Sequence, residues 1–290
     1  MSRIPAVTAR DPAGAPQQST AMFRHALCGE TLLALPALSQ AARLLPPGAV
    51  ERRVHDARDG AGFRKLAHDP HGLERLAEQG AVDEWVMLTR LETLPAYAGL
   101  FDRLLAALHP AIRDRTGHPR DVRGFVFVSA PGTHTPLHFD AEWNVLFQIE
   151  GTKTFATLPA HPPFLTLAER EAYHATGENL IAWHPDYAAF AQEHALAPGD
   201  ALFVPYEAPH YVRNGDAVSI SLSVTWQDRW SRDVADAARI GPILRRFGIS
   251  PHDPLCDQGR PRLRAIASRM VQRAETVSRR LGTARNRQGA

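Results

Sequence analysis

The spacing of hydrophobic and polar residues divides the chain into three parts, and the first part is helical in character. Between Phe23 and about His118, segments such as "ETLLALPALSQAARLL" and "AYAGLFDRLLAALHP" carry apolar residues at three- and four-residue spacing and are punctuated by proline. That spacing is typical of amphipathic helices. Between these segments, "EWVMLTRL" has the composition of a strand. We predict a helical N-terminal region, residues 23–121, that packs on the core.

The second part, from Val122, has the pattern of short strands. Its runs of β-branched and aromatic residues are separated by Gly, Pro and Asn, as in "GFVFVSAPG", "NVLFQIEGTKTFATL" and "HYVRNGDAVSISLSVTW". Several short strands with tight turns predict a β-sandwich or barrel. A helical insert, residues 160–195, which contains "TLAEREAYHATG", interrupts them. We therefore predict a mainly β core over residues 122–228.

The third part returns to helix after Trp226, and we predict a basic C-terminal helical region over residues 229–290. The segment "RPRLRAIASRMVQRAETVSRRLG" places an apolar stripe along one face of a helix, with Gly282 in position to end it. The stripe consists of Leu263, Ile266, Met270, Ala274, Val277 and Leu281.

Composition sets limits on the class of protein. A chain of 290 residues with 44% hydrophobic content can bury a sizeable core. The first 22 residues lack the apolar centre of a signal peptide, and we predict a disordered leader over residues 1–22. No run approaches the roughly 18 apolar residues of a membrane span. Cys28 and Cys256 lie far apart and form no CxxC, which argues against a disulfide framework. These features predict a cytoplasmic protein without a membrane partner.

Charge is distributed unevenly along the chain. The net charge is +2, but the part from Arg229 onward carries 14 Arg and 5 acidic residues, against 19 basic and 26 acidic residues before it. Clustered positive charge attracts phosphate, so a nucleic-acid-associated protein is one interpretation. The same helix, however, has an apolar stripe that must be covered. A homodimer formed through the C-terminal helices is therefore the preferred prediction, and nucleic acid is the alternative.

The stretch "TPLHFDAEW" places a His and an Asp two residues apart. Side chains alternate along a strand, so His138 and Asp140 point to one side while Leu137 and Phe139 point to the other. The common reason for such a pair is a solvated strand face. The alternative is that the two side chains are metal ligands.

A second candidate ligand, His210, lies in a predicted hairpin. Asn214-Gly215 flanked by strand-like sequence is a strong hairpin signal, and a two-residue turn there pairs His210 with Ser219. His210 then shares its face with a row of small polar residues, and the apolar residues of the same strand occupy the other face. Such a row either faces water or lines a cavity, and we predict a cavity. The row consists of Ser219, Ser221, Ser223 and Thr225.

Two His and one carboxylate on one side of a strand framework form the facial triad that binds Fe(II) and leaves coordination positions open. Zinc can use the same ligands. Lys153 favours iron, because it lies in the strand after Asp140 and offers a fixed cation to a dicarboxylate that chelates the metal. Only Lys65 and Lys153 are lysine among the 33 basic residues. The alternative for Lys153 is an ordinary surface lysine.

These residues together resemble the cupin-like JmjC family of 2-oxoglutarate-dependent Fe(II) oxygenases, particularly the branch that contains asparaginyl and other protein hydroxylases. The likeness covers roughly Val122 to Trp226 and implies a double-stranded β-helix, or jelly-roll, core. It rests on six spaced positions, which are Thr135, His138, Asp140, Asn144, Lys153 and His210.

The resemblance implies a role for each position. The two His and the Asp would hold iron, and Lys153 would pair with the distal carboxylate of 2-oxoglutarate. Thr135 and Asn144 would hydrogen-bond near it, although strand alternation puts Thr135 opposite His138, so a bend is required. Where the hydroxylases place an Asn on the final core strand, this chain offers Ser223 or Thr225.

The same resemblance implies an enzyme that uses Fe(II), 2-oxoglutarate and O₂, hydroxylates a C–H bond and releases succinate and CO₂. Demethylation would follow if that carbon were attached to nitrogen. The substrate class stays open between a protein or peptide side chain, a modified RNA base and a small molecule. A non-catalytic cupin-like binding or regulatory protein is the first alternative, because fold alone does not establish activity.

Overall fold

The computed structural model describes residues 7–9, 18–55, 63–78, 84–256 and 261–288. The chain forms two compact units. The first unit contains the described residues up to 164 together with 180–228, and the second contains residues 165–179 and the described residues from 229 onward. Each unit is described by itself.

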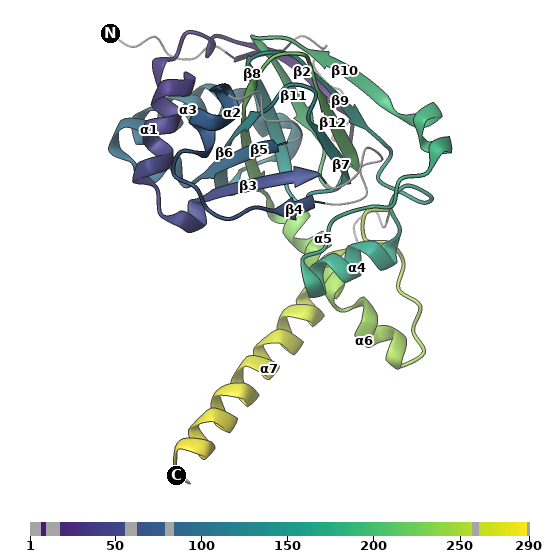
Figure 1. The fold of residues 1–290 in the computed structure, drawn as a ribbon. Coiled ribbons are helices and arrows are strands. Elements are labelled where there is room, and N and C mark those ends of the chain that lie inside the picture. Colours follow the sequence, from purple (N-terminus) through teal and green to yellow (C-terminus); the bar gives the residue numbers. More distant parts are fainter. Residues whose placement is uncertain (1–6, 10–17, 56–62, 79–83, 257–260, 289–290) are drawn as a thin grey trace. The chain divides into compact units, whose positions relative to one another are not determined.

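Two antiparallel sheets form the first unit (Figure 1). The larger has nine strands in the order β1-β2-β11-β8-β13-β6-β5-β3-β4, and the smaller has four in the order β10-β9-β12-β7. The strands are β1 (Val7–Ala9), β2 (Ala21–His25), β3 (Val50–His55), β4 (Phe63–Lys65), β5 (Glu84–Thr89), β6 (Arg120–Ser129), β7 (His134–His138), β8 (Trp143–Glu150), β9 (Lys153–Thr157), β10 (Gln192–Leu196), β11 (Asp200–Val204), β12 (His210–Asn214) and β13 (Ser219–Gln227).

The strands β6 to β13 have jelly-roll topology. In the larger sheet β6, β13, β8 and β11 are neighbours, and the smaller sheet contains β7, β12, β9 and β10. The chain therefore passes repeatedly from one sheet to the other, as in the double-stranded architecture of a jelly roll. The predicted β-rich core with helical flanks is confirmed.

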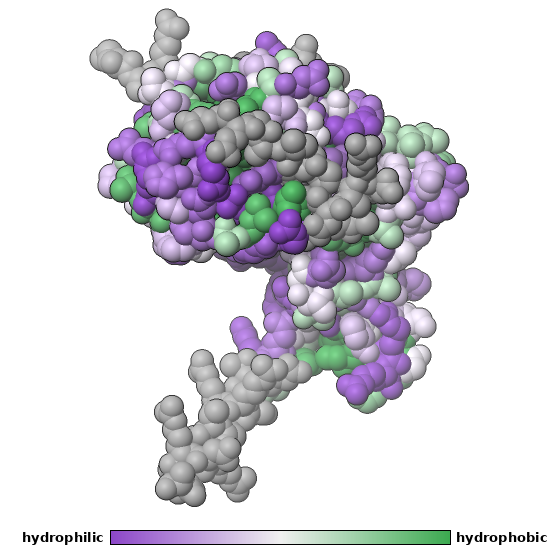
Figure 2. Space-filling view, viewed as in Figure 1, coloured by the Kyte–Doolittle hydropathy of each residue, from purple (hydrophilic) through white to green (hydrophobic). Residues whose placement is uncertain are grey.

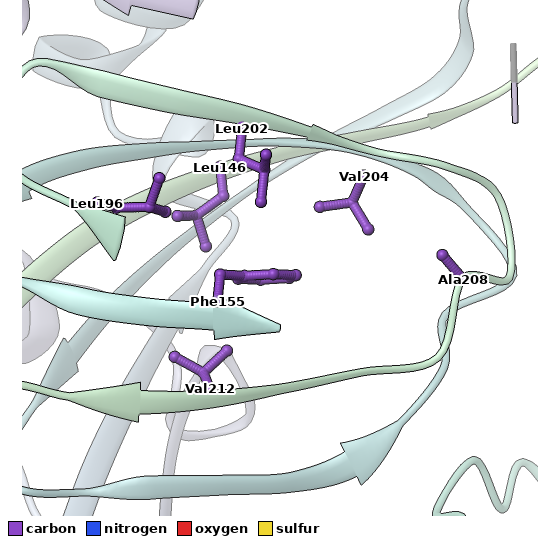
Figure 3. Packing of buried hydrophobic residues seen from close by; sticks show 7 residues of the cluster. All are labelled: Leu146, Phe155, Leu196, Leu202, Val204, Ala208 and Val212. Carbon is purple, nitrogen blue, oxygen red and sulfur yellow. The ribbon is translucent and has the colours of Figure 1, made fainter. Parts of the chain in front are cut away.

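Both faces of the central strand β8 are buried, which explains its almost continuous apolar sequence. The interior between the two sheets contains a cluster of buried apolar side chains contributed by both of them (Figure 3). This cluster consists of Leu146, Phe155, Leu196, Leu202, Val204, Ala208 and Val212. We call the sheet faces that line this space the inner faces.

The N-terminal region is mixed rather than helical, so the prediction for residues 23–121 is only partly correct. The predicted strand in "EWVMLTRL" is β5, which pairs with β6, but β2, β3 and β4 also extend the larger sheet. The charged residues of β3 and β4 conceal their strand character, because they form cross-strand ion pairs such as Lys65 Nζ to Glu51, 2.9 Å. The helices of this region are α1 (Leu35–Leu44), α2 (Gly72–Glu78) and α3 (Pro95–Thr116), with short 3₁₀ turns at Thr31–Leu33, Pro47–Ala49 and Leu91–Thr93.

The predicted disordered leader also requires correction where the structure describes it. Residues Val7–Ala9 form β1, which pairs with β2, and β2 begins at Ala21. The proposed boundary at residues 22 and 23 therefore falls inside a strand. Residues 1–6 and 10–17 lie outside the described residues.

The predicted hairpin at Asn214-Gly215 is wrong. Strand β12 pairs with β7 and β9, whereas β13 pairs with β6 and β8 in the other sheet. The backbone N–H of Asn214 donates to Thr133 O (2.9 Å) and that of Gly215 donates to Thr152 O (2.8 Å). These neighbouring turns hold the segment where it crosses between sheets, so tertiary hydrogen bonds override the local turn signal.

The second unit is helical. Its helices are α4 (Leu167–Thr176), α5 (Arg229–Arg239), α6 (Gly241–Arg246) and α7 (Pro261–Gln288). Ion pairs connect α4 with α6, through Arg245 and Glu171, and α7 with α5, through Arg269, which donates to Asp233 (2.6 Å) and Asp236 (2.7 Å). The guanidinium of Arg170 in α4 pairs with Asp253, which lies between α6 and α7. The middle of the predicted insert 160–195 thus belongs with the C-terminal helices, while the 3₁₀ helix Pro185–Phe190 and β10 belong to the first unit.

Helix α7 differs from its prediction in two ways. It continues through Gly282 to Gln288, which agrees with the modest cost, about 1 kcal/mol, of a helical Gly. It packs on α5 through a face that includes the buried Ala265 and Ser268. The predicted stripe is exposed where its side chains are described, at Leu263 (73%), Ile266 (44%) and Met270 (59%). None of the helices within the described ranges combines the length and apolar content that a membrane span requires.

The close contact between α3 and β6 makes Gly124 a test of this packing. A Cβ added at Gly124 would lie 2.0 Å from the ring of Phe101, which is 6% exposed. We expect Gly124→Ala to lower the free energy of unfolding by about 1–3 kcal/mol in denaturant titrations. Gly48→Ala is the control, because nothing lies within 4 Å of its added Cβ. Failure of Phe101→Leu to restore stability in Gly124→Ala would contradict this explanation.

Candidate metal centre

Three potential ligands meet at one end of the smaller sheet. His138 is the last residue of β7, His210 is the first residue of β12, and the register pairs them directly. Asp140 follows two residues after the end of β7. Its Oδ2 lies 3.9 Å from His138 Nε2 and 3.7 Å from His210 Nε2. The three candidate ligand atoms lie within 4.8 Å of one another, so a single cation can contact all of them.

Both His rings are oriented by backbone carbonyls. The Nδ1 of His138 lies 2.8 Å from Pro136 O, and the Nδ1 of His210 lies 2.9 Å from Ala208 O. A carbonyl only accepts, so each Nδ1 carries the proton and each Nε2 presents a lone pair to the centre. This arrangement is the one that metal-binding histidines generally use.

His210 is held as a neutral ring. Burial, followed by the neighbouring His138, lowers the pKa of His210 to about 4. Phe155 stacks on the His210 ring, with centroids 4.9 Å apart and planes 16° apart. A neutral, immobilised imidazole needs neither deprotonation nor reorientation before it binds a cation.

The third ligand is the most accessible. The side chain of Asp140 is 41% exposed, against 14% for His138 and 6% for His210. The carbonyl of Asp140 accepts a hydrogen bond from the Glu207 N–H (3.0 Å), which connects the segment after β7 to the loop before β12. The centre therefore opens to solvent on the Asp140 side, and this is the side from which a second molecule can approach.

Lys153 is buried on the inner face of the smaller sheet. It is the first residue of β9, is 6% exposed, and its Nζ donates to Ser221 Oγ at 2.9 Å. No carboxylate in the described parts of the chain forms an ion pair with it. Burial lowers the pKa of Lys153 to about 7. A buried ammonium with only a neutral partner is costly, so the site favours an anion.

The strand register places Lys153 and the His pair on the same face but at opposite ends of it. Along β12, His210 is paired with Thr157 of β9 and Asn214 is paired with Lys153. Four residues of strand span about 13 Å. A lysine side chain and a short diacid, placed end to end, can span the distance from the Lys153 backbone to the His pair.

Thr135 reaches the inner face through a β-bulge. On β7 three steps separate Thr135 from His138, whereas on β12 two steps separate their partners, Val212 and His210. The additional residue changes which face Thr135 occupies, because cross-strand partners point the same way and Val212 lies on the face of His210. The bulge therefore supplies the bend that simple strand alternation required.

The remaining predicted residues lie on the inner face of the larger sheet. Thr225 is opposite Asn144 and Ser223 is opposite Leu146, and all four are buried. The Oδ1 of Asn144 is buried and has no hydrogen-bond partner among the described residues. Thr225 is therefore the neighbour of Asn144, at the end of the strand nearest Trp143, and Ser223 lies one inward-facing position further along.

Two residues of this region were not predicted. Ser221 is the partner of Lys153, although the sequence shows it only as one member of a polar row. Glu142, two residues before Asn144, lies beside Arg123 (3.7 Å between side-chain N and O). Burial, together with the nearby Asp140 carboxylate, raises the pKa of Glu142. Its two-residue spacing from both Asp140 and Asn144 was a signal that could have identified it.

Comparison with known proteins agrees with this architecture. Residues 96–232 match the family model described as a cupin-like domain. The chain contains a cupin-like domain. The resemblance drawn from six spaced residues is confirmed at this level, and the cupin-like domain includes the whole candidate metal centre and Lys153.

The cupin-like domain has curated relatives of greater length. HSPB1-associated protein 1 of Homo sapiens is 32% identical over 108 residues, which cover 34% of this chain and 22% of that protein. Lysine-specific demethylase 8 of Danio rerio is 34% identical over 103 residues, which cover 33% of this chain and 25% of that protein. The matched segments thus span about a quarter of each relative.

Among solved structures, Escherichia coli ycfD has a TM-score of 0.48 at 15% identity, covering 89% of this chain and 65% of that one. The same protein, described as a ribosomal oxygenase in complex with cobalt and 2-oxoglutarate, has a TM-score of 0.47 at 13% identity, covering 92% of this chain and 67% of that one.

Proposed function

We propose that the protein is an Fe(II)- and 2-oxoglutarate-dependent oxygenase that hydroxylates a C–H bond. The observation that carries this proposal is Lys153, a buried cation with no acidic partner among the described residues, on the same inner face as the His138–Asp140–His210 group. A metal-binding cupin of another kind has no need for a buried ammonium beyond the ligands. A metal-chelating diacid requires one.

The residues present fit the metal and the co-substrate. Two neutral imidazoles and one carboxylate are the donor set of non-haem Fe(II) oxygenases, which leaves open positions for the co-substrate and O₂. When bound, Fe(II) with 2-oxoglutarate and O₂ supplies the oxidation of the C–H bond, with release of succinate and CO₂. The fit is supported by the orientation of both Nε2 atoms.

Each protein group has a binding or shielding role in this proposal. His138, Asp140 and His210 hold the metal, and Lys153 neutralises the distal carboxylate of the co-substrate. Thr135, Asn144 and Thr225 supply polar contacts along the inner faces, and we assign Thr225 rather than Ser223 to the final contact because it adjoins Asn144. The inner apolar cluster around Phe155 keeps water from the co-substrate.

The substrate is proposed to approach on the exposed Asp140 side. A protein or peptide side chain and a small molecule both fit an opening of this kind, and hydroxylation is proposed ahead of demethylation. The relatives named above include a lysine-specific demethylase. Substrates whose target carbon is attached to nitrogen are therefore the first to test for demethylation.

An anaerobic titration tests the proposed function. Addition of 2-oxoglutarate to the Fe(II)-loaded protein is expected to produce the weak visible charge-transfer band of a metal-chelated 2-oxo acid. His138→Ala should abolish the band, because it removes a ligand, and zinc in place of iron should give none. A non-catalytic binding protein predicts no band in the wild type, and that result would refute the proposal.

A homodimer formed through the C-terminal helices is proposed as the oligomeric state. The second unit exposes Leu263, Ile266 and Met270 on α7, and Figure 2 shows hydrophobic residues on this unit beside hydrophilic ones. Exposed apolar residues that share one face of a helix favour a surface that a partner covers. We expect Leu263→Glu combined with Met270→Glu to convert a dimer to a monomer in light scattering. Arg273→Glu, at an exposed position of the same helix, is the control.

Nucleic acid is the alternative partner of this basic region. It predicts that the double variant still binds RNA with a steep salt dependence, whereas Arg273→Glu weakens that binding. A wild-type protein that is monomeric at micromolar concentration would refute the proposed dimer.

A further inference from the structure

Leu180 extends the row of residues that contains the two candidate His ligands. Across the smaller sheet, Thr157 of β9 pairs with His210 of β12, and His210 pairs with His138 of β7. His138 in turn pairs with Leu180 in an isolated antiparallel bridge. Cross-strand partners point to the same face of a sheet, so all four side chains lie on the inner face. Leu180 is thus the neighbour of His138 on the side away from His210.

The bridge brings the side chains of His138 and Leu180 close together. The backbone N–H of Ile181 donates to Leu137 O at 2.9 Å, one residue along each segment from the pair. This pattern is that of a non-hydrogen-bonded antiparallel pair, whose Cα atoms lie about 4.5 Å apart and whose side chains are the closer kind. The hydrogen bond joins backbone atoms only, so the side chain at position 180 can be replaced without removing it.

The inner space opens toward Leu180. Thr157 and His210 are 6% and 4% exposed, whereas His138 and Leu180 are both partly exposed. The row therefore passes from a closed interior to the surface at the residue beside a metal ligand. A molecule that enters on this side passes the leucine side chain before it reaches the centre.

The larger sheet is also apolar and incompletely covered on its inner face beside the polar row of β13. Phe125 pairs with Ser223 and lies on that inner face. Its ring stacks on that of Phe127, with centroids 6.5 Å apart, and both residues are partly exposed. Val126 and Val128, on the opposite face of the same strand, are 0% exposed. Apolar side chains on both faces of a strand favour burial of both faces, so a ligand that covers the phenylalanines is favoured.

We infer that Leu180 contacts the substrate and that the substrate group brought to the metal is apolar, such as an aliphatic side chain. This inference rests on the proposed function. A cationic or other strongly polar group placed against Leu180 would lose hydration without gaining a hydrogen bond from it. The charged residues of this region are engaged elsewhere, because Arg123 lies 3.7 Å from Glu142 and Asp140 is a ligand of the proposed metal. Leu180 therefore acts as a specificity-determining residue for an apolar group.

The test uses two probes of nearly equal shape and different polarity, N-acetyl-leucine amide and N-acetyl-asparagine amide. Protein saturated with Mn(II) and 2-oxoglutarate broadens the proton resonances of a probe bound near the metal, and protein saturated with Zn(II) gives the diamagnetic reference. Titration of each probe gives its Kd. We expect the wild type to bind the leucine probe about tenfold more tightly, the scale of apolar burial in a pocket.

Two variants of Leu180 separate polarity from size. Leu180→Asn keeps the shape of the side chain and is expected to reduce the preference for the leucine probe from about tenfold to below about threefold. Leu180→Ala removes the contact without adding a polar group, so it should weaken the leucine probe and leave the asparagine probe unchanged within about twofold. Leu44→Asn is the matched control, because Leu44 is 66% exposed on α1 and its replacement should preserve the wild-type preference.

Three results would overturn the inference. They are a wild type without metal-dependent broadening of the leucine probe, a wild type that binds the asparagine probe equally well or better, and Leu180 variants that keep the wild-type preference. The proposed function is tested separately by the visible band of the Fe(II)-loaded protein with 2-oxoglutarate. A normal band together with any of these three results refutes the role of Leu180 alone, whereas an absent band in the wild type refutes the function.

Discussion

Replacing His210 with alanine is expected to abolish tight metal binding by the folded protein. The change removes one of three ligand atoms and leaves the Nε2 of His138 and the carboxylate of Asp140, which lie 3.9 Å apart. Loss of a supporting residue around a metal typically costs 10- to 100-fold in affinity, so loss of a direct ligand should cost at least about a hundredfold. Titration with Co(II), followed by its visible absorption, measures the effect.

Thr157→Val is the matched control for this change. Thr157 is the β9 partner of His210, is 6% exposed, and lies in the same layer of the sheet. Its replacement is expected to preserve Co(II) binding, although the protein becomes less stable. Retention of wild-type affinity by His210→Ala, in a variant with a normal unfolding transition, would show that the three residues are not the ligand set.

The alternation of side chains along a strand predicted which residues of the core face the same side of a sheet. This pattern is reliable because successive residues of a strand point to opposite faces of the sheet. The two-residue spacing of His138 and Asp140 and the polar alternation of β13 both survive in the structure. Thr135 needed the additional residue in β7, which no periodic pattern contains. The position of this bulge is fixed by pairing with β12, a strand more than 70 residues away.

Local signals failed where distant partners provided better hydrogen bonds. Asn-Gly predicts a hairpin, but in this chain the Gly215 N–H bonds to Thr152 rather than closing a turn between β12 and β13. The strands β3 and β4 were missed because their charged residues pair across the sheet, where sequence alone shows a polar segment. Both failures concern interactions between residues that are distant in the sequence.

The contact between Lys153 and Ser221 was also beyond sequence analysis, although each residue was noted separately. Lysine is usually exposed, and a serine in a row of four carries no sign of its partner. Only the way in which the two sheets pack face to face identifies Ser221, rather than Ser219 or Ser223, as the hydrogen-bond partner of Lys153. The candidate metal ligands were easier to recognise because a donor set has a fixed composition, whereas the partner of a buried cation can come from many residue types.

The affinity for 2-oxoglutarate is expected to fall steeply as the pH rises above neutrality. Burial lowers the pKa of Lys153 to about 7, and its hydrogen-bond partner is a hydroxyl. Below about pH 7 the free protein already carries the ammonium, so binding takes up no proton. Above that pH the amine is neutral and must gain a proton to pair with the carboxylate, which costs up to about tenfold in affinity per pH unit.

Calorimetry of the Mn(II)-loaded protein in buffers of different ionisation enthalpy measures this proton uptake. We expect about one proton per 2-oxoglutarate at pH 8.5, approaching none at pH 6, as linkage requires for a group with this pKa. Lys153→Arg is the control, because a guanidinium stays charged throughout and its affinity, even if weaker, should not vary with pH in this range. Equal proton uptake by Lys153→Arg and the wild type would assign the titration to another group. A wild-type affinity that is constant from pH 6 to 8.5 would show that Lys153 remains charged when buried, and that the hydroxyl of Ser221 is sufficient to stabilise its charge.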